Sequence, residues 1–252
     1  AEDRIHELLQ ATYEMMGAQP DDHGAARIRA ALEPVQGMNT QELRANFAPK
    51  YNAHFDCTYT YAVYGSGDVL LETHVLPGDD LPPLPRVGLT MTLPGGYEQY
   101  TWYGRGPHEN YVDRKESAMV GVYRSTVDEQ YVPYVVPQEN GNKTDVRWVA
   151  LTDDEGAGLL ATAAPGEVLE VSAHHFTAED LTRAMHTHEL PRRDEITLNL
   201  DYRQSGLGGA SCGPGTLPQY LLQPGEVRYT VRLRPLAPEE SPITVSKRYI
   251  AE

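Results

Sequence analysis

A period of two runs through residues 57–76, and this pattern restricts the fold of the chain more than any other feature of the sequence. Alternate residues from Cys57 to Val63 are Cys, Tyr, Tyr and Val, and alternation with this period is typical of a β-strand. The tetrapeptide GSGD at residues 65–68 then indicates a turn, and the alternation resumes over residues 69–75. The two runs and the turn between them predict a β-hairpin.

Strand patterns of the same kind recur along the rest of the chain, separated by clusters of Gly, Pro and Asp. They cover residues 86–93, 145–151, 167–173, 195–203 and 226–236. The 16 tyrosines, 22 glycines and 19 prolines of the 252-residue chain favour strands joined by many turns over helices. Many short strands at close spacing predict an all-β chain, folded as a large antiparallel sandwich of two sheets.

Two stretches of the sequence favour helix instead. Thr177 and Asp180 have the spacing of a capping box, so one short helix or turn is expected near residues 177–186. Residues 2–16 contain good helix formers, although the alternation over residues 5–9 also permits a strand. Propensity alone predicts a helix there.

Charge, hydrophobicity and cysteine content restrict the partners and the location that are expected for the chain. The formal net charge of −15 and the scattered basic residues argue against nucleic acid, whose phosphates need clustered Lys and Arg. Only 40% of the residues are hydrophobic and no long apolar run occurs, so no membrane span is expected. No signal peptide precedes Glu2, and Cys57 and Cys212 are expected to be reduced, so a cytoplasmic location is expected.

The histidines are the first candidates for chemistry. Imidazoles titrate near neutrality and can move protons to and from sugars, which singles out His174, His175 and His188. If residues 186–188 were extended, the side chains of His186 and His188 would lie on the same face. That spacing can bind a metal. Because no Asp, Glu or Cys is recognised at ligand spacing, we expect no metal site.

Three acidic residues in polar, loop-like stretches are candidates for a pair of catalytic carboxyl groups: Glu109, Asp113 and Glu139. A glycosidase needs two such groups flanking one bond, with one of them kept protonated. No spacing marks a nucleophile among the three. Roles in capping turns or in pairing with Arg105 and Arg114 are therefore favoured.

The segment SGLGGASCGPG at residues 205–215 places five glycines and a proline around Cys212. Its glycines form only part of a dinucleotide fingerprint and no helix pattern follows, so a phosphate cradle is not expected. No basic side chain stands near Cys212 in the sequence to stabilise a thiolate. Glycines permit positive φ and close backbone approach, so the segment is predicted to be a projecting loop.

The stretch from Leu84 to Ala118, with WYGRGPHENYVDR at residues 102–114, closely resembles the C-terminal sandwich domain, or small-chain region, of the β-galactosidases of glycoside hydrolase family 2. The likeness covers about residues 50–235. It includes the segments at residues 54–78, 131–151, 181–190 and 206–214. Across the first fifty residues it is looser.

The resemblance implies a galactose-mutarotase-like sandwich that occupies residues 1–252 as a single domain, with the N-terminal segment extended rather than helical. It also implies that the catalytic glutamates lie on a separate (β/α)8 barrel, which alone needs about 250 residues. We therefore expect no catalytic residue and no cofactor on this chain, since whole enzymes of the family bind Mg²⁺ and Na⁺ through other domains. The implied partners are a barrel domain or large subunit and β-galactoside sugars, in an enzyme that is commonly a homo-oligomer.

By the same resemblance, the loop at residues 205–215 reaches toward the mouth of the barrel. Its expected substrate-rim residues are Gly208, Gly209, Ser211 and Cys212. A well-known member of the family has a tryptophan at the position of Cys212, and a thiol gives a much smaller contact to a sugar than an indole does. Weaker stacking of the non-galactose part of the substrate is expected. The charged residues at 105–114 are expected to fix a buried turn by ion pairing.

Two alternatives remain open. A stand-alone aldose 1-epimerase on the same fold would use His174, His175 or His188 with a carboxylate, and a simple carbohydrate-binding module would bind galactosides without turnover. The leading interpretation also predicts an exposed apolar patch for a partner.

Overall fold

The computed structural model describes residues 54–79, 81–209 and 213–248, which belong to one compact unit that begins at His54. The expectations for residues 2–16, helical by propensity and extended by resemblance, lie outside the described residues, as do Ser211 and Cys212. The expectation that the whole chain is one domain therefore stays a prediction.

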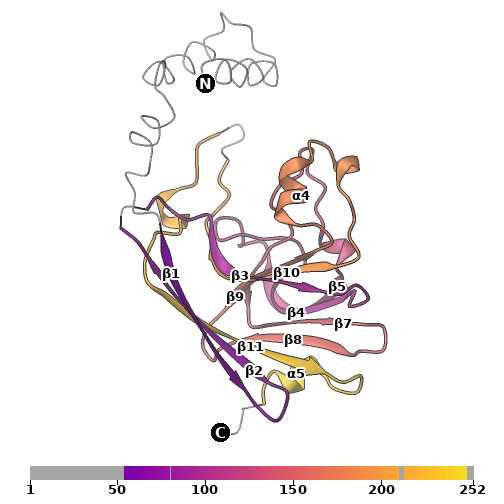
Figure 1. The fold of residues 1–252 in the computed structure, drawn as a ribbon. Helices are drawn as coiled ribbons and strands as arrows, with labels where there is room; N and C mark the ends of the chain where they lie inside the picture. The colour runs from indigo at the N-terminus through magenta and orange to yellow at the C-terminus, as the bar shows by residue number, and fades with distance from the viewer. Residues whose placement is uncertain (1–53, 80, 210–212, 249–252) are drawn as a thin grey trace, which may run out of the picture. The chain divides into compact units, whose positions relative to one another are not determined.

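Two antiparallel sheets make up the described unit (Figure 1). The larger has the order β1-β2-β11-β8-β7-β4-β5 and the smaller has the order β3-β10-β9-β6. The strands are β1 (Phe55–Val63), β2 (Val69–Pro77), β3 (Arg86–Leu93), β4 (Gln99–Gly106), β5 (Met119–Thr126), β6 (Lys143–Val146), β7 (Trp148–Thr152), β8 (Gly158–Ala163), β9 (Leu169–His174), β10 (Ile196–Gln204) and β11 (Val227–Leu236). The predicted all-β, two-sheet sandwich is confirmed.

Helical structure is confined to short pieces in the described part of the chain. They are η2 (Asp128–Gln130), α4 (Ala178–Arg183), η3 (Thr187–Glu189), η4 (Pro218–Tyr220) and α5 (Pro242–Val245). The capping box predicted from Thr177 and Asp180 is present at the start of α4, so the short helix is confirmed. None of the described helices is long and apolar enough to cross a membrane.

The predicted hairpin is formed by β1 and β2, which pair in register from Phe55 opposite Pro77 to Val63 opposite Val69. The carboxylate of Asp68, at the end of the turn, is buried and accepts hydrogen bonds from Arg232 Nε at 2.6 Å and Arg234 Nη1 at 2.8 Å. The two guanidinium groups offset the free-energy cost of burying this carboxylate, and they join the hairpin to β11.

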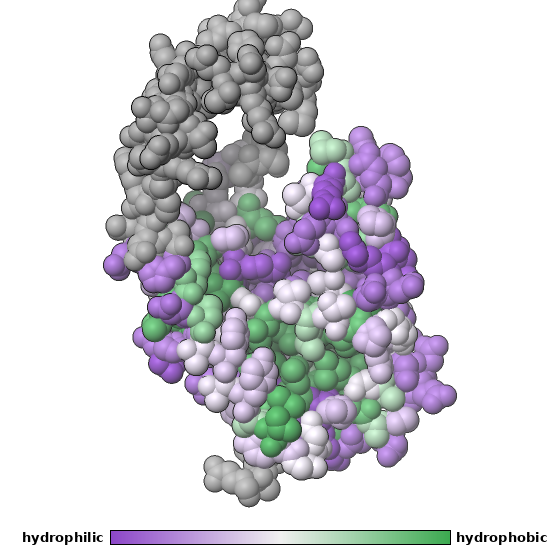
Figure 2. Space-filling model, viewed as in Figure 1, coloured by the Kyte–Doolittle hydropathy of each residue, from purple (hydrophilic) through white to green (hydrophobic). Residues whose placement is uncertain are grey.

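Strand β1 is an edge strand, and its alternation does not produce a buried face among the described residues. Tyr61, for example, is 62% exposed. Its large apolar side chains that point to one side form an exposed strip, which we call the β1 strip: Phe55, Tyr59, Tyr61 and Val63. Figure 2 shows apolar side chains on the surface elsewhere too, and hydrophilic ones gathered around α4.

The core lies between the two sheets, because alternate residues of the central strands point inward. On β10, Ile196, Leu198 and Leu200 join the core, and on β4, Tyr100 and Trp102 do so. The pattern is the one expected for two sheets packed face to face.

Replacing Leu198, which is 0% exposed, tests this arrangement. Leu198→Ala removes buried methyl groups and leaves a cavity, so we expect the free energy of unfolding in urea to fall by about 2–5 kcal/mol. The matched control is Leu217→Ala, because Leu217 is 55% exposed and surface changes cost under about 0.5 kcal/mol. Equal losses in the two variants would contradict the assignment of the core.

Candidate functional site

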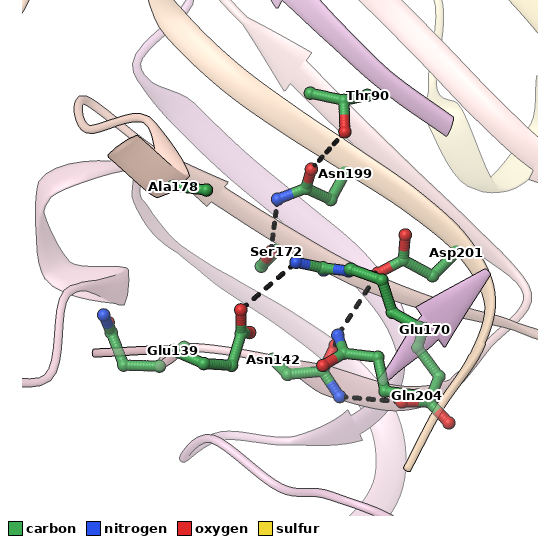
Figure 3. Close-up of polar contacts among 12 residues, drawn as sticks. Thr90, Glu139, Asn142, Glu170, Ser172, Ala178, Asn199, Asp201 and Gln204 are labelled. Carbon is green, nitrogen blue, oxygen red and sulfur yellow. Dashed lines mark hydrogen bonds and ion pairs between the residues drawn. The ribbon is translucent and has the colours of Figure 1, made fainter. Parts of the chain in front are cut away.

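The face of the smaller sheet that points away from the core is lined with polar side chains. The inward positions of β10 are apolar, so Asn199 and Asp201 lie on the opposite face. Asn199 accepts a hydrogen bond from Thr90 Oγ1 at 2.8 Å and donates one to Ser172 Oγ at 3.0 Å (Figure 3). One row of polar groups therefore crosses β3, β10 and β9.

The strongest interaction on this face joins Arg86 on β3 to Asp201 on β10. Arg86 donates from Nε at 3.1 Å and from Nη2 at 2.5 Å to Asp201 Oδ2, and from Nη1 to Glu139 Oε2 at 3.2 Å. The side chain of Asp201 is only 2% exposed. Burial lowers the pKa of Arg86, but the two nearby carboxylates outweigh this effect, so the pKa of Arg86 is raised. Burial raises the pKa of Asp201 and of Glu139. The guanidinium is thus the charge that holds the buried Asp201 and the partly buried Glu139 in place.

Amide side chains extend this pair into a network (Figure 3). Gln204 Nε2 donates to Asp201 Oδ2 and to Asn142 Oδ1, each at 3.2 Å, and Asn142 Nδ2 donates to Glu170 Oε2 at 3.0 Å. Burial raises the pKa of Glu170 to about 7, against the opposing influence of Asn142 and Arg203.

The segment at residues 102–114 forms a fixed turn beside the network. Glu109 accepts hydrogen bonds from Arg114 Nη2 at 2.5 Å, from the Tyr134 hydroxyl and from the Gly141 backbone N–H at 2.7 Å. The predicted pairing of Glu109 with Arg114 is confirmed. Arg105 also forms an ion pair, but its partner is Asp145, whose Oδ2 accepts a hydrogen bond from Arg105 Nε at 2.5 Å, and not one of the three candidate acids.

Within the described part of the chain, Asp113 has no ion-pair partner and instead holds the base of the predicted loop. Its Oδ2 accepts a hydrogen bond from the Gly208 N–H at 2.7 Å. Gly206 packs so closely on Asp113 that a Cβ there would lie 2.6 Å from the carboxyl carbon, so only glycine fits. Gly208 has φ of 62°, which also favours glycine. Close packing at Gly206 and a positive φ at Gly208 therefore explain why glycine occupies these two positions.

The two arms of the loop are joined to each other and to the sheet. Gly209 N donates to Pro214 O at 3.2 Å, and Thr216 Oγ1 donates to Gly206 O at 2.8 Å. Ser205 Oγ donates to Leu84 O and accepts from Leu222 N. Gly208 and Gly209, two of the expected rim residues, thus lie on the first of two paired arms, which leave the sandwich beside β3 (Figure 1). The other two, Ser211 and Cys212, are outside the described residues.

The histidines considered for proton transfer lie in two different settings. His174 and His175 are buried at the end of β9. His174 Nε2 lies 2.9 Å from Asn140 O, and burial lowers the pKa of His174 to about 4. His175 Nε2 lies 2.8 Å from Glu98 Oε2. His188, by contrast, is exposed in η3.

Sequence reasoning did not single out Arg86, Asp201, Glu170 or Asn142. For Asp201 the only signal was a polar residue at alternate positions of the strand at residues 195–203, which is also what a solvated sheet face shows. Asp201, Glu170 and Asn142 are buried in the folded chain, and they come from segments that are distant from one another in the sequence.

Together these features define a β-sandwich domain in which one sheet face carries a network of hydrogen-bonded polar side chains. The family described as "Beta galactosidase small chain" matches residues 9–233, and the chain belongs to this family. The resemblance noted from the sequence is thereby confirmed.

Similar proteins are β-galactosidases that are much longer than this chain. The β-galactosidase of Priestia megaterium is 39% identical over 172 residues, which cover 68% of this chain and 16% of that protein. The β-galactosidase of Arthrobacter sp. is 38% identical over 218 residues, covering 84% and 21%. A galactose mutarotase related enzyme from Lactobacillus acidophilus aligns with a TM-score of 0.35 and 9% identity over 79% of this chain and 66% of that one.

The buried carboxyl of Glu170 gives a testable pH dependence. Its pKa in the folded protein is about 7, above the ordinary 4.5, so the stability it contributes is complete at low pH and is lost as the pH rises through 7. Between pH 5 and pH 8, the free energy of unfolding of the natural chain should fall by roughly 2–3 kcal/mol relative to that of Glu170→Gln.

Urea unfolding at the two pH values measures this difference. Glu116→Gln, a change at an exposed glutamate, serves as the control and should follow the natural chain at both pH values. A constant difference between the natural chain and Glu170→Gln would contradict the assignment.

Proposed function

We propose that this chain is the non-catalytic C-terminal part of a β-galactosidase, which completes the rim of the sugar site through the loop at residues 205–215 and packs on a catalytic barrel. The hydrolysis of terminal β-D-galactosides would belong to the whole enzyme. The observation that carries the proposal is the hydrogen bond from Gly208 N to Asp113 Oδ2, because it ties this loop to the segment that resembles the galactosidases most closely.

The state of the acidic residues supports a non-catalytic role. A glycosidase acid must reach the glycosidic oxygen, and its partner must reach the anomeric carbon or a water. Glu109 and Glu139 are instead engaged by Arg114, Tyr134 and Arg86. Both carboxyl groups therefore serve to hold the fold.

The β1 strip supports packing against further protein. An edge strand with a row of exposed aromatic and aliphatic side chains is unusual in a chain that works alone. The chain spans about a fifth or less of the length of the relatives named above. A barrel-bearing part of the enzyme is the occupant we propose for this strip.

Complementation tests the proposal directly. The 252-residue chain is mixed with the Arthrobacter β-galactosidase from which the segment aligned with this chain has been deleted. We expect hydrolysis of a chromogenic β-galactoside above that of the deleted enzyme alone, and none from the chain by itself. A mixture no more active than the deleted enzyme, or hydrolysis by the purified chain, would overturn the proposal.

The same mixture tests the role of Asp113 as a positioning residue. Asp113→Ala removes the acceptor for Gly208 N, so we expect KM to rise about tenfold with kcat nearly unchanged. Asp113→Asn retains a side-chain oxygen and should restore most of the affinity. The control is Asp154→Ala, at an exposed aspartate, which should leave both constants unaltered. Equal effects of the two alanine variants would refute the assignment.

The alternative function, that of an aldose 1-epimerase, predicts a different experimental result. Polarimetry of freshly dissolved α-galactose with the purified chain would show accelerated mutarotation, lost in His174→Asn or His175→Asn. Because both imidazoles are buried and engaged, we expect no acceleration.

A further inference from the structure

A group of potential metal ligands lies on η3, outside the network and the loop. The imidazoles of His186 and His188 and the carboxylate of Glu189 each offer a ligand atom, and these atoms lie within 4.8 Å of one another. All three residues are exposed. Sequence reasoning missed the group because it considered an extended segment and did not recognise Glu189 as a partner.

The 3-10 turn explains why these side chains converge. The Glu189 N–H donates to His186 O at 3.1 Å, which closes the turn. Within this turn the two imidazole rings stack, with centroids 5.4 Å apart. An extended segment would also place His186 and His188 on one side, but it would direct Glu189 to the other. The turn therefore adds the third ligand.

Backbone hydrogen bonds hold the carboxylate of Glu189 in position. Its Oε2 accepts from Met185 N at 2.8 Å and from His186 N at 3.3 Å, while Oε1 lies 2.9 Å from His186 Nδ1. The carboxylate is thus oriented before any ligand binds, as groups around metal ligands commonly are.

We propose that His186, His188 and Glu189 form a surface site for a divalent transition-metal ion of the Zn²⁺ or Co²⁺ type. Two imidazole nitrogens and one carboxylate oxygen suit such an ion, whereas Mg²⁺ prefers oxygen ligands. A tetrahedral Zn²⁺ site requires ligand atoms about 3.4 Å apart. Exposed side chains reach that spacing by small rotations, and a fourth position stays open to water or to a ligand from another molecule.

Isothermal titration of the 252-residue chain with ZnCl2 in metal-free buffer at pH 7.5 tests the site. We expect one ion per chain with a micromolar Kd. His188→Asn and Glu189→Gln should each weaken binding by roughly tenfold or more. CoCl2 should give visible d–d absorption that both variants lose, and MgCl2 should give no binding heat at this site.

A matched control distinguishes Zn²⁺ binding at this site from Zn²⁺ binding elsewhere on the surface. His108→Asn changes an exposed histidine that hydrogen-bonds Ser117 Oγ at 3.0 Å, and it should bind Zn²⁺ as the natural chain does. Because all the substituted side chains are exposed, thermal unfolding of the apo-proteins should coincide. The proposal is overturned if the natural chain binds Zn²⁺ more weakly than about 100 µM, which is far below the strength of built zinc sites. It is also overturned if His188→Asn and Glu189→Gln bind as tightly as His108→Asn.

Discussion

The pairing of Arg86 with Asp201 is the interaction on which the polar side of this sandwich depends. A carboxylate that is 2% exposed needs a charged partner, since an isolated buried charge is strongly destabilising. Arg86 supplies that charge to Asp201 and to Glu139 together. Removing the guanidinium would leave the buried Asp201 and the partly buried Glu139 with raised pKa values, and both would then tend to take up protons.

The consequence of this pairing is a rigid platform beneath the loop. Gln204, the last residue of β10, is held by Asp201 and Asn142, and the next residue, Ser205, begins the first arm of the loop. The second arm returns through Leu222, whose N–H donates to Ser205 Oγ. Both arms therefore start from groups that cannot shift without breaking a hydrogen bond that is at least partly buried. Asp113 adds a third anchor further out, at Gly208.

The sequence predicted the local structure well and the site poorly, for physical reasons. Strands and the capping box depend on neighbouring residues, so alternation and the spacing of Thr177 and Asp180 were sufficient. Arg86 and Asp201 are separated by 115 residues, and Asp113 and Gly208 by 95. Nothing local distinguishes such residues from a solvated face. The resemblance located the loop, but not its anchors.

A buried charged network is a costly way to hold two sheets and a loop together, because apolar packing of similar volume is often as stable. Its advantage is that it tolerates few alternative arrangements: each donor in the network has a specific acceptor, and a displaced partner leaves a charge unpaired. Apolar side chains at the same positions would permit small sliding movements of β3 against β10. For a loop whose proposed role is to shape the rim of a sugar site, the position of its base matters more than the stability of the domain. The Arg86–Asp201 pair is therefore best explained as a device that fixes where the loop begins.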